Sequence, residues 1–301
     1  MVDKKQMVEC VPNFSEGRHL DKIEKIVNLF RKKAGVKLLD YQRDKDHNRL
    51  VVTVVGEPLA VKSAVIESVG MAIQLIDMRK HKGQHPRMGA VDVIPFIPIK
   101  NISMTETVDL SKTVAKEVFE KYQLPVFLYE ASASSFARQN LSTIRKGQFE
   151  NMAKKIKQSD WKPDFGEKEI HPTAGVTAIG ARMPLIAFNV NLDTANINIA
   201  NQIAKSVRHT SGGLRYCKGI GIHLKERGIV QVSMNMTDYT KTSLYRSFEL
   251  IRIEAKRYGV NVVGSEIVGL VPMAALIETA EFYLGLENFS MDQVLETNIM
   301  E

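Results

Sequence analysis

The segment 81–99, HKGQHPRMGAVDVIPFIPI, contains residues that can carry out proton transfer. His81 and His85 lie in a stretch that glycines and a proline keep from forming a regular helix. The apolar run 91–99 follows, with Asp92 as its only charge. Loops at the mouth of a buried strand often hold catalytic side chains, and an imidazole of pKa about 6.5 suits acid–base catalysis near neutral pH.

Two other interpretations of this loop compete with acid–base catalysis. His81 and His85 are four residues apart, a spacing that suits two metal ligands on one helix face. The loop is not expected to be helical, and no cysteine or third histidine is close in sequence, so a metal site is disfavoured. An imidazole that caps a turn is the structural alternative, and the residues alone leave it open.

Arginines become important if the ligand is a dicarboxylate, because a guanidinium can hold a carboxylate through two hydrogen bonds. Arg87 stands out because it follows His85 by two residues. The arginines at predicted strand or loop ends are Arg49, Arg87, Arg182 and Arg215.

Composition indicates an ordinary soluble globular protein. The chain has 301 residues, 44% apolar content and a net charge of +7, from 41 Lys and Arg against 34 Asp and Glu, which favours an anionic ligand. We expect no membrane span and no signal peptide, and the distant Cys10 and Cys217 indicate a reduced, cytoplasmic setting. No strand carries the stacked aromatics of an RNA-binding module, so we expect no nucleic-acid partner.

The order of predicted elements indicates an α+β fold. The first half predicts strands at 7–14, 36–41, 50–55 and 91–97 with helices at 19–33 and 58–78, and the second half predicts the same β-α-β-β-α-β order from 185 to 284. We therefore expect two α+β sandwiches in tandem, with a ligand cleft between them. Segment 159–182 has no clear period, and we expect an ordered connection that lines a site.

Six segments make the chain resemble the formiminotransferase domain family, found in formiminotransferase-cyclodeaminase and in stand-alone bacterial glutamate formiminotransferases. They span nearly the whole chain: VECVPNFSEG (8–17), LIDMRKHKGQHPRMGAVDVIPFIP (75–98), DWKPDFG (160–166), GARMPLIAFNVNL (180–192), QVSMNMTDY (231–239) and VVGSEIVGLVP (262–272). No sequence remains for a cyclodeaminase domain, so the chain resembles the single-activity form.

The resemblance implies a fold and an activity. It implies two tandem ferredoxin-like (split βαβ) subdomains, at 1–182 and 183–301, packed around an interdomain folate cleft. It implies transfer of a formimino group between 5-formiminotetrahydrofolate and L-glutamate, in histidine degradation, with tetrahydrofolate as co-substrate and without a metal. A cytoplasmic homodimer acting on small molecules, away from membranes and nucleic acids, is also implied.

The resemblance further implies the site residues. The histidine before Pro-Arg-Met-Gly, His85, is the general base. The substrate-binding residues would be Asn48, Arg49, Arg87, Asp164, Arg182 and, in the folate loop 166–175, Gly166, His171, Pro172, Thr173 and Gly175. Gln42 replaces an acidic residue of vertebrate members, and this places a carboxylate role there in doubt.

Three alternative functions remain open at this point. Two are enzymatic: a glutamate formyltransferase, or an enzyme that processes 5-formyltetrahydrofolate on the same scaffold. The third is a non-catalytic binder of folate or nucleic acid, which would bind its ligand without consuming N-formiminoglutamate. Assays with both donors, and the salt dependence of any RNA binding, separate these possibilities.

Overall fold

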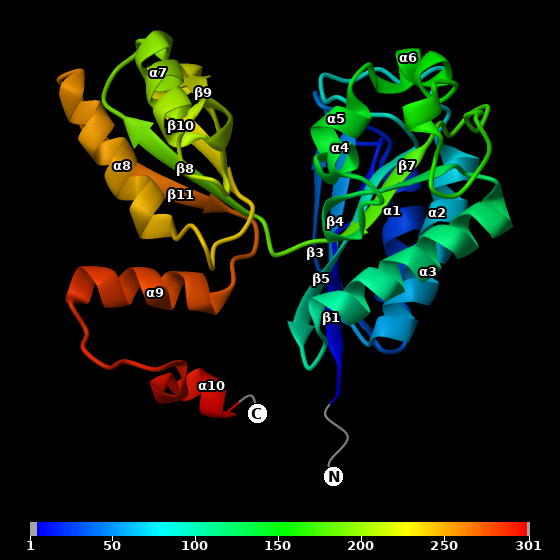
Figure 1. The fold of residues 1–301 in the computed structure, drawn as a ribbon, viewed down its shortest axis with the longest axis horizontal. Coiled ribbons are helices and arrows are strands. Elements are labelled where there is room, and N and C mark those ends of the chain that lie inside the picture. Colours follow the sequence, from blue (N-terminus) through cyan, green and yellow to red (C-terminus); the bar gives the residue numbers. More distant parts are fainter. Residues whose placement is uncertain (1–4, 300–301) are drawn as a thin grey trace. The chain divides into compact units, whose positions relative to one another are not determined.

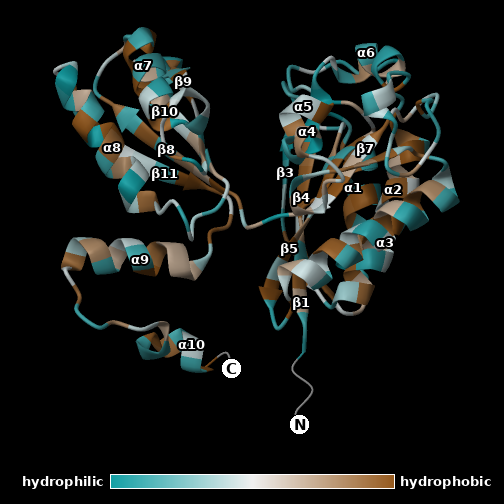
Figure 2. Ribbon diagram, in the orientation of Figure 1, coloured by the Kyte–Doolittle hydropathy of each residue, from teal (hydrophilic) through white to brown (hydrophobic). Residues whose placement is uncertain are grey.

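The computed structural model describes residues 5–299 and divides between Arg182 and Met183 into two compact units (Figure 1). Figure 2 shows hydrophobic residues concentrated in the strands, while the helices carry both hydrophobic and hydrophilic residues. The predicted α+β class, with two tandem β-α-β-β-α-β units, is confirmed.

The first unit begins with a split βαβ sandwich. Its elements are β1 (Met7–Cys10), β2 (Asn13–Phe14), α1 (Leu20–Arg31), β3 (Val36–Asp44), β4 (Arg49–Gly56), α2 (Pro58–Leu75) and β5 (Val91–Lys100). The strands β1 and β2 both pair with β4 and β5, and β3 pairs with the outer side of β4. Helix α1 buries Ile23, Ile26, Val27 and Phe30, the apolar stripe that its sequence predicts.

Helix α2 is long and apolar enough to cross a membrane by length and composition alone. Its buried residues, which include Val61, Val65 and Val69, belong to the core of the first unit. This is the arrangement of a core helix in a globular domain.

Two further strands extend the first sheet. Helix α3 (Met104–Tyr122) leads to β6 (Val126–Leu128), and β7 (Thr177–Ala181) lies between β5 and β6, parallel to both. The segment 159–182, which was expected to be an ordered connection, therefore contains a strand at 177–181. Those five residues are all buried, and a short parallel strand covered on both faces has no alternation that would reveal it.

A second, smaller core covers the opposite face of these added strands. Val93, Phe127 and Ala178 alternate with residues of the main core and pack with Ile144 and Met152. The covering helices are α4 (Phe136–Gln139), α5 (Leu141–Arg145) and α6 (Gln148–Lys155). Short 3₁₀ helices lie at Glu130–Ser132, Ser159–Trp161, His209–Ser211, Lys225–Arg227 and Met291–Gln293.

The second unit repeats the split βαβ plan with four antiparallel strands in the order β11-β8-β10-β9. Its core is formed by one face of the sheet with α7 and α8. The elements are β8 (Ile186–Leu192), α7 (Ile197–Val207), β9 (Cys217–Leu224), β10 (Ile229–Met236), α8 (Leu244–Arg257), β11 (Val262–Val268), α9 (Met273–Leu284) and α10 (Leu295–Ile299).

Close backbone packing anchors the loop before β5. Ala90 N–H donates to the Ala174 carbonyl at 2.9 Å, and Val176 N–H donates to the Met88 carbonyl at 3.1 Å. A Cβ atom on Gly89 would lie only 2.0 Å from the Val176 carbonyl oxygen. Only glycine fits at this crossing of two backbones.

We expect Gly89→Ala to lower the free energy of unfolding by about 1–3 kcal/mol, because the loop must move to relieve the clash. Gly219→Ala is the matched control, since a Cβ on this buried glycine meets nothing closer than 3.7 Å. Urea denaturation of both variants measures the difference. Equal stability of the two variants would contradict the packing argument.

Candidate active site

The candidate site lies where the loop before β5 meets the ends of β2 and β4. Arg49, at the start of β4, extends its guanidinium across the sheet. Its Nη2 donates to Asn13 Oδ1 on β2, and its Nη1 lies 3.3 Å from Asp92 Oδ2 on β5. The same Nη1 reaches the ring of His85 in the loop. Three strands and one loop therefore contribute to one polar cluster.

Asp92 is the anionic centre of this cluster and is only 1% exposed. Its carboxylate accepts hydrogen bonds from Met88 N–H at 3.0 Å and from Arg145 Nη2 at 2.6 Å, in addition to Arg49. A charged carboxylate in an apolar strand is costly unless it is paired. Two guanidinium groups against one carboxylate leave the cluster with a net positive charge.

The environment of His85 keeps its ring neutral. Arg49 Nη1 lies 2.7 Å from Nδ1 and 2.9 Å from Nε2 of His85, and a ring nitrogen can accept this hydrogen bond only when it carries no proton. Burial, followed by the charges of Arg49 and Arg145, lowers the pKa of His85 to about 4, against the opposing effect of Asp92. Burial also lowers the pKa of Arg49, to about 10. At neutral pH the imidazole is a free base.

His81 is held differently and has a structural role. Its Nε2–H donates to the Asn48 carbonyl at 3.0 Å, and its Nδ1 accepts from Arg87 Nε at 3.2 Å. Both nitrogens are thus engaged in a neutral tautomer, and burial lowers the pKa of the ring. Within residues 5–299, no group of three or more His, Cys, Asp or Glu side chains is arranged to hold a metal ion.

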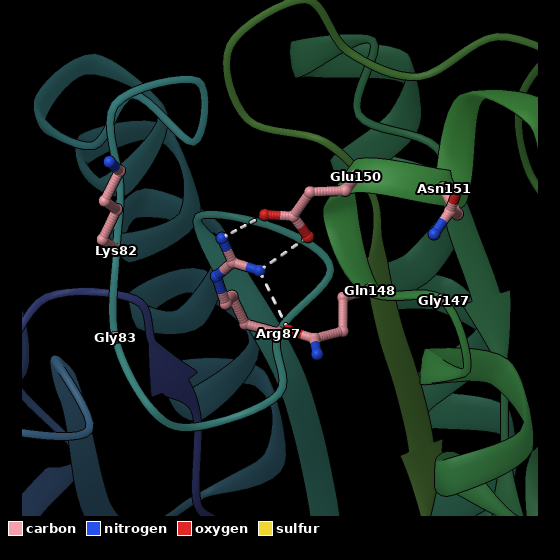
Figure 3. A pocket seen from close by; sticks show the side chains of 7 residues that line it. All are labelled: Lys82, Gly83, Arg87, Gly147, Gln148, Glu150 and Asn151. Atoms are coloured by element: carbon pink, nitrogen blue, oxygen red, sulfur yellow. Dashed lines mark hydrogen bonds and ion pairs between the residues drawn. The ribbon is translucent and has the colours of Figure 1, made fainter.

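Arg87 forms one wall of a cavity of about 510 Å³ (Figure 3). Its guanidinium donates to both carboxylate oxygens of Glu150, at 2.7 and 2.9 Å, and to Gln148 at 3.0 Å. The Glu150 carboxylate therefore binds the guanidinium of Arg87, the group that was predicted to hold a substrate carboxylate. The lining residues are Lys82, Gly83, Arg87, Gly147, Gln148, Glu150 and Asn151.

Other predicted residues support the loops around this site. Asn48 accepts from Gly17 N–H at 2.9 Å and donates to the Lys82 carbonyl at 3.0 Å, so it ties the histidine loop to the start of β4. His171 and Gly175 close a turn through mutual backbone hydrogen bonds, with Pro172 and Thr173 between them. The Thr173 carbonyl accepts from Met78 N–H at 2.8 Å.

Three predicted residues have partners outside the Arg49–Asp92 cluster. Asp164 pairs with Arg138 at 3.0 Å and accepts from the Leu128 N–H. Gly166 adopts φ +123°, a backbone conformation that favours glycine, beside Pro125. Arg182 donates its backbone N–H to the Phe96 carbonyl, and its charge opposes the rise that burial causes in the pKa of Glu9.

Sequence reasoning missed Asn13, Asp92 and Arg145 as members of the site. Asp92 carried a usable signal, because a lone carboxylate within an apolar strand requires buried cationic partners. Arg145 carried none, since 53 residues separate it from its partner and its helix is only five residues long.

Family models and individual relatives point to the same protein family over nearly the whole chain. Residues 7–182 match a family model described as the formiminotransferase domain, N-terminal subdomain, and residues 187–300 match one described as the formiminotransferase domain. A glutamate formimidoyltransferase of Streptococcus pyogenes serotype M1 is 54% identical over 98% of this chain and 99% of its own length. One from Thermoplasma acidophilum is 45% identical over 96% of each. The formimidoyltransferase-cyclodeaminase of Rattus norvegicus is 43% identical over 94% of this chain and 53% of its own length.

The lowered pKa of His85 predicts a pH-dependent stability. In the unfolded chain this ring has a pKa of about 6.5, whereas in the folded chain its pKa is about 4. Between these two pH values the unfolded chain therefore binds a proton at His85 that the folded chain does not bind. Stability is therefore lost as the pH falls through this window. We expect His85→Gln to lose less free energy of unfolding than the wild type between pH 7 and pH 4.5.

Urea denaturation at several pH values measures this difference. His223→Gln, at an exposed histidine of β9, is the control and should follow the wild type. Parallel pH profiles for the wild type and His85→Gln would contradict the burial and charge argument.

Proposed function

The chain belongs to the formiminotransferase domain family, and on this premise we propose that it transfers a formimino group between 5-formiminotetrahydrofolate and L-glutamate, with His85 as the general base. The chain is a transferase of one-carbon groups. The observation that carries the assignment of His85 is its neutral ring, in contact with Arg49 and two residues before Arg87.

Charge supports the fit of the substrates. Folate and glutamate are carboxylates, and the cluster has two guanidinium groups for one carboxylate. The buried Nε of Arg145 has no hydrogen-bond partner among the described residues. A buried donor without a partner is costly, so a substrate oxygen at this position would satisfy it.

The proton inventory of the reaction explains the need for a neutral imidazole. The ammonium group of glutamate must lose a proton before its nitrogen can attack the formimino carbon, and His85 has the lone pair to accept that proton. When bound, the folate supplies the formimino group as an activated amidine. Substrate carboxylates offset the charges of Arg49 and Arg145, and this raises the pKa of His85 toward the range of an effective base. The imidazolium then holds a proton for the departing folate nitrogen.

Holding both substrates side by side removes much of the entropic cost of a bimolecular reaction. Arg49 is positioned for this task because Asn13 and Asp92 fix its guanidinium from two strands. The cavity beside Arg87 offers further room for ligand groups, with Lys82 and Asn151 on its walls.

We expect His85→Gln to lower kcat by roughly 10²–10⁴-fold, as for loss of a general base, while the far-ultraviolet circular dichroism stays that of the wild type. Transfer from N-formiminoglutamate to tetrahydrofolate is the assay. Wild-type turnover in this variant would refute the role of His85. Parallel assays with N-formylglutamate separate formimino from formyl transfer.

Arg145→Gln tests the charge effect on His85. Loss of this cation raises the pKa of His85, so the acid limb of kcat/KM, set by the free enzyme, moves from about pH 4 toward pH 6.5. Arg145→Lys keeps the charge and should keep the limb near its wild-type position. An unmoved limb in Arg145→Gln would show that another group controls the profile.

A further inference from the structure

A lysine outside the candidate site holds the segment that carries Arg145. Lys155 is the last residue of α6, and its ammonium group lies at the C-terminal end of α5. Its Nζ donates to three backbone carbonyls, those of Thr143 at 2.6 Å, Ile144 at 2.7 Å and Lys146 at 3.3 Å. An ammonium group has three N–H donors, so all of them are used here. The carbonyls of the residues before and after Arg145 are therefore bound to one cation.

The surroundings of Lys155 keep its side chain charged and fixed. The last carbonyl oxygens of a helix have no partner within the helix and carry partial negative charge, which a cation stabilises. Lys155 Nζ also lies 3.7 Å from the centre of the half-buried Trp161 ring, in a cation–π contact. Burial, followed by the charge of Lys146, lowers the pKa of Lys155 to about 8, so the side chain remains an ammonium ion at neutral pH.

Arg145 depends on this backbone anchor, because its own side chain has few polar contacts. Among the described residues its guanidinium forms one hydrogen bond, from Nη2 to Asp92 Oδ2 at 2.6 Å, and its buried Nε has no partner. Arg49, by contrast, donates to Asn13 as well as to Asp92. A side chain with a single hydrogen bond is placed mainly by its backbone, and a helix of five residues is not stable by itself.

A purely structural role for Lys155 is the alternative. Ile144 of α5 and Met152 of α6 are both buried in the second core of the first unit, so apolar packing also holds the two helices together. That packing keeps α5 on the sheet whether or not the end of the helix is fixed. The two roles differ in whether His85 responds to Lys155, because the charge of Arg145 acts on the His85 ring.

We propose, resting on the proposed function, that Lys155 is a positioning residue for the general base His85. It fixes the C-terminal end of α5, and this keeps Arg145 against Asp92 and beside the His85 ring. Because the anchor acts on the backbone, the remaining N–H donors of Arg145 stay available for a substrate oxygen. Within residues 5–299 no hydrogen bond or ion pair joins Lys155 to His85 or to Asp92, so its effect on the base passes through Arg145.

Lys155→Met tests this role in the full chain, because it keeps an unbranched apolar side chain and removes the ammonium group. Titration of the unliganded protein by nuclear magnetic resonance measures the pKa of His85. We expect this pKa to rise from about 4 to at least about 5, because the charge of Arg145 is no longer held beside the ring. The acid limb of kcat/KM should move in the same direction. Lys154→Met, at an exposed lysine of the same helix, is the control and should change neither.

A double mutant separates positioning from a general structural effect. In the Arg145→Gln background there is no guanidinium to position, so Lys155→Met should cause no further change in the pKa of His85. A second rise of similar size in this background would show that Lys155 acts through its own charge or by loosening the fold, and this would overturn the proposal. An unchanged pKa of His85 in the single variant Lys155→Met also overturns it.

Two further outcomes are separated by the same titration. If Lys155→Met melts far below the wild type, Lys155→Gln takes its place, since it is neutral and too short to reach all three carbonyls: a raised pKa of His85 supports the proposal, and an unchanged pKa overturns it. The titration needs no turnover. A pKa of His85 that depends on Lys155 in a chain without transfer activity would therefore support the positioning role and refute the proposed function.

Discussion

The pairing of one buried carboxylate with two guanidinium groups is the constraint on which the candidate site depends. A buried carboxylate in an apolar strand is costly unless cationic groups pair with it, and Arg49 and Arg145 form these pairs with Asp92. These ion pairs fix the two arginines beside His85, where burial and then the charges of both arginines lower the pKa of the ring. Asp92 also accepts from the Met88 N–H, so the same carboxylate holds the loop that carries His85.

The two histidines of this loop show how environment divides identical side chains between roles. Both rings of His81 and His85 are neutral at pH 7, because burial lowers both pKa values. Both ring nitrogens of His81 form hydrogen bonds, one with the Asn48 carbonyl and one with Arg87, and these bonds support the loop. The ring of His85 instead accepts a hydrogen bond from the side chain of Arg49, which Asn13 and Asp92 hold in place.

The two units share the β-α-β-β-α-β topology but differ in what lies on the second face of the sheet. In the first unit, α4 to α6 cover the second face of the added strands and supply Arg145 to the site. In the second unit, the face of the sheet that does not contact α7 and α8 is polar instead. Strands β8, β10 and β11 place amide side chains and a carboxylate there. Strand alternation allows this, since core residues and polar residues occupy alternate positions along each strand.

The sequence by itself determined the fold class and most elements, because helical and strand periodicity are local properties that Ile23 to Phe30 or Ile186 to Leu192 express without their partners. It also singled out His85 and Arg49, through motifs that resemble a known family. Only the tertiary structure decided that 177–181 is a strand between β5 and β6. It also decided that Glu150 forms an ion pair with Arg87 and that Arg145 forms one with Asp92. Such contacts join residues far apart in the chain, and no local pattern encodes a partner 53 or 63 positions away.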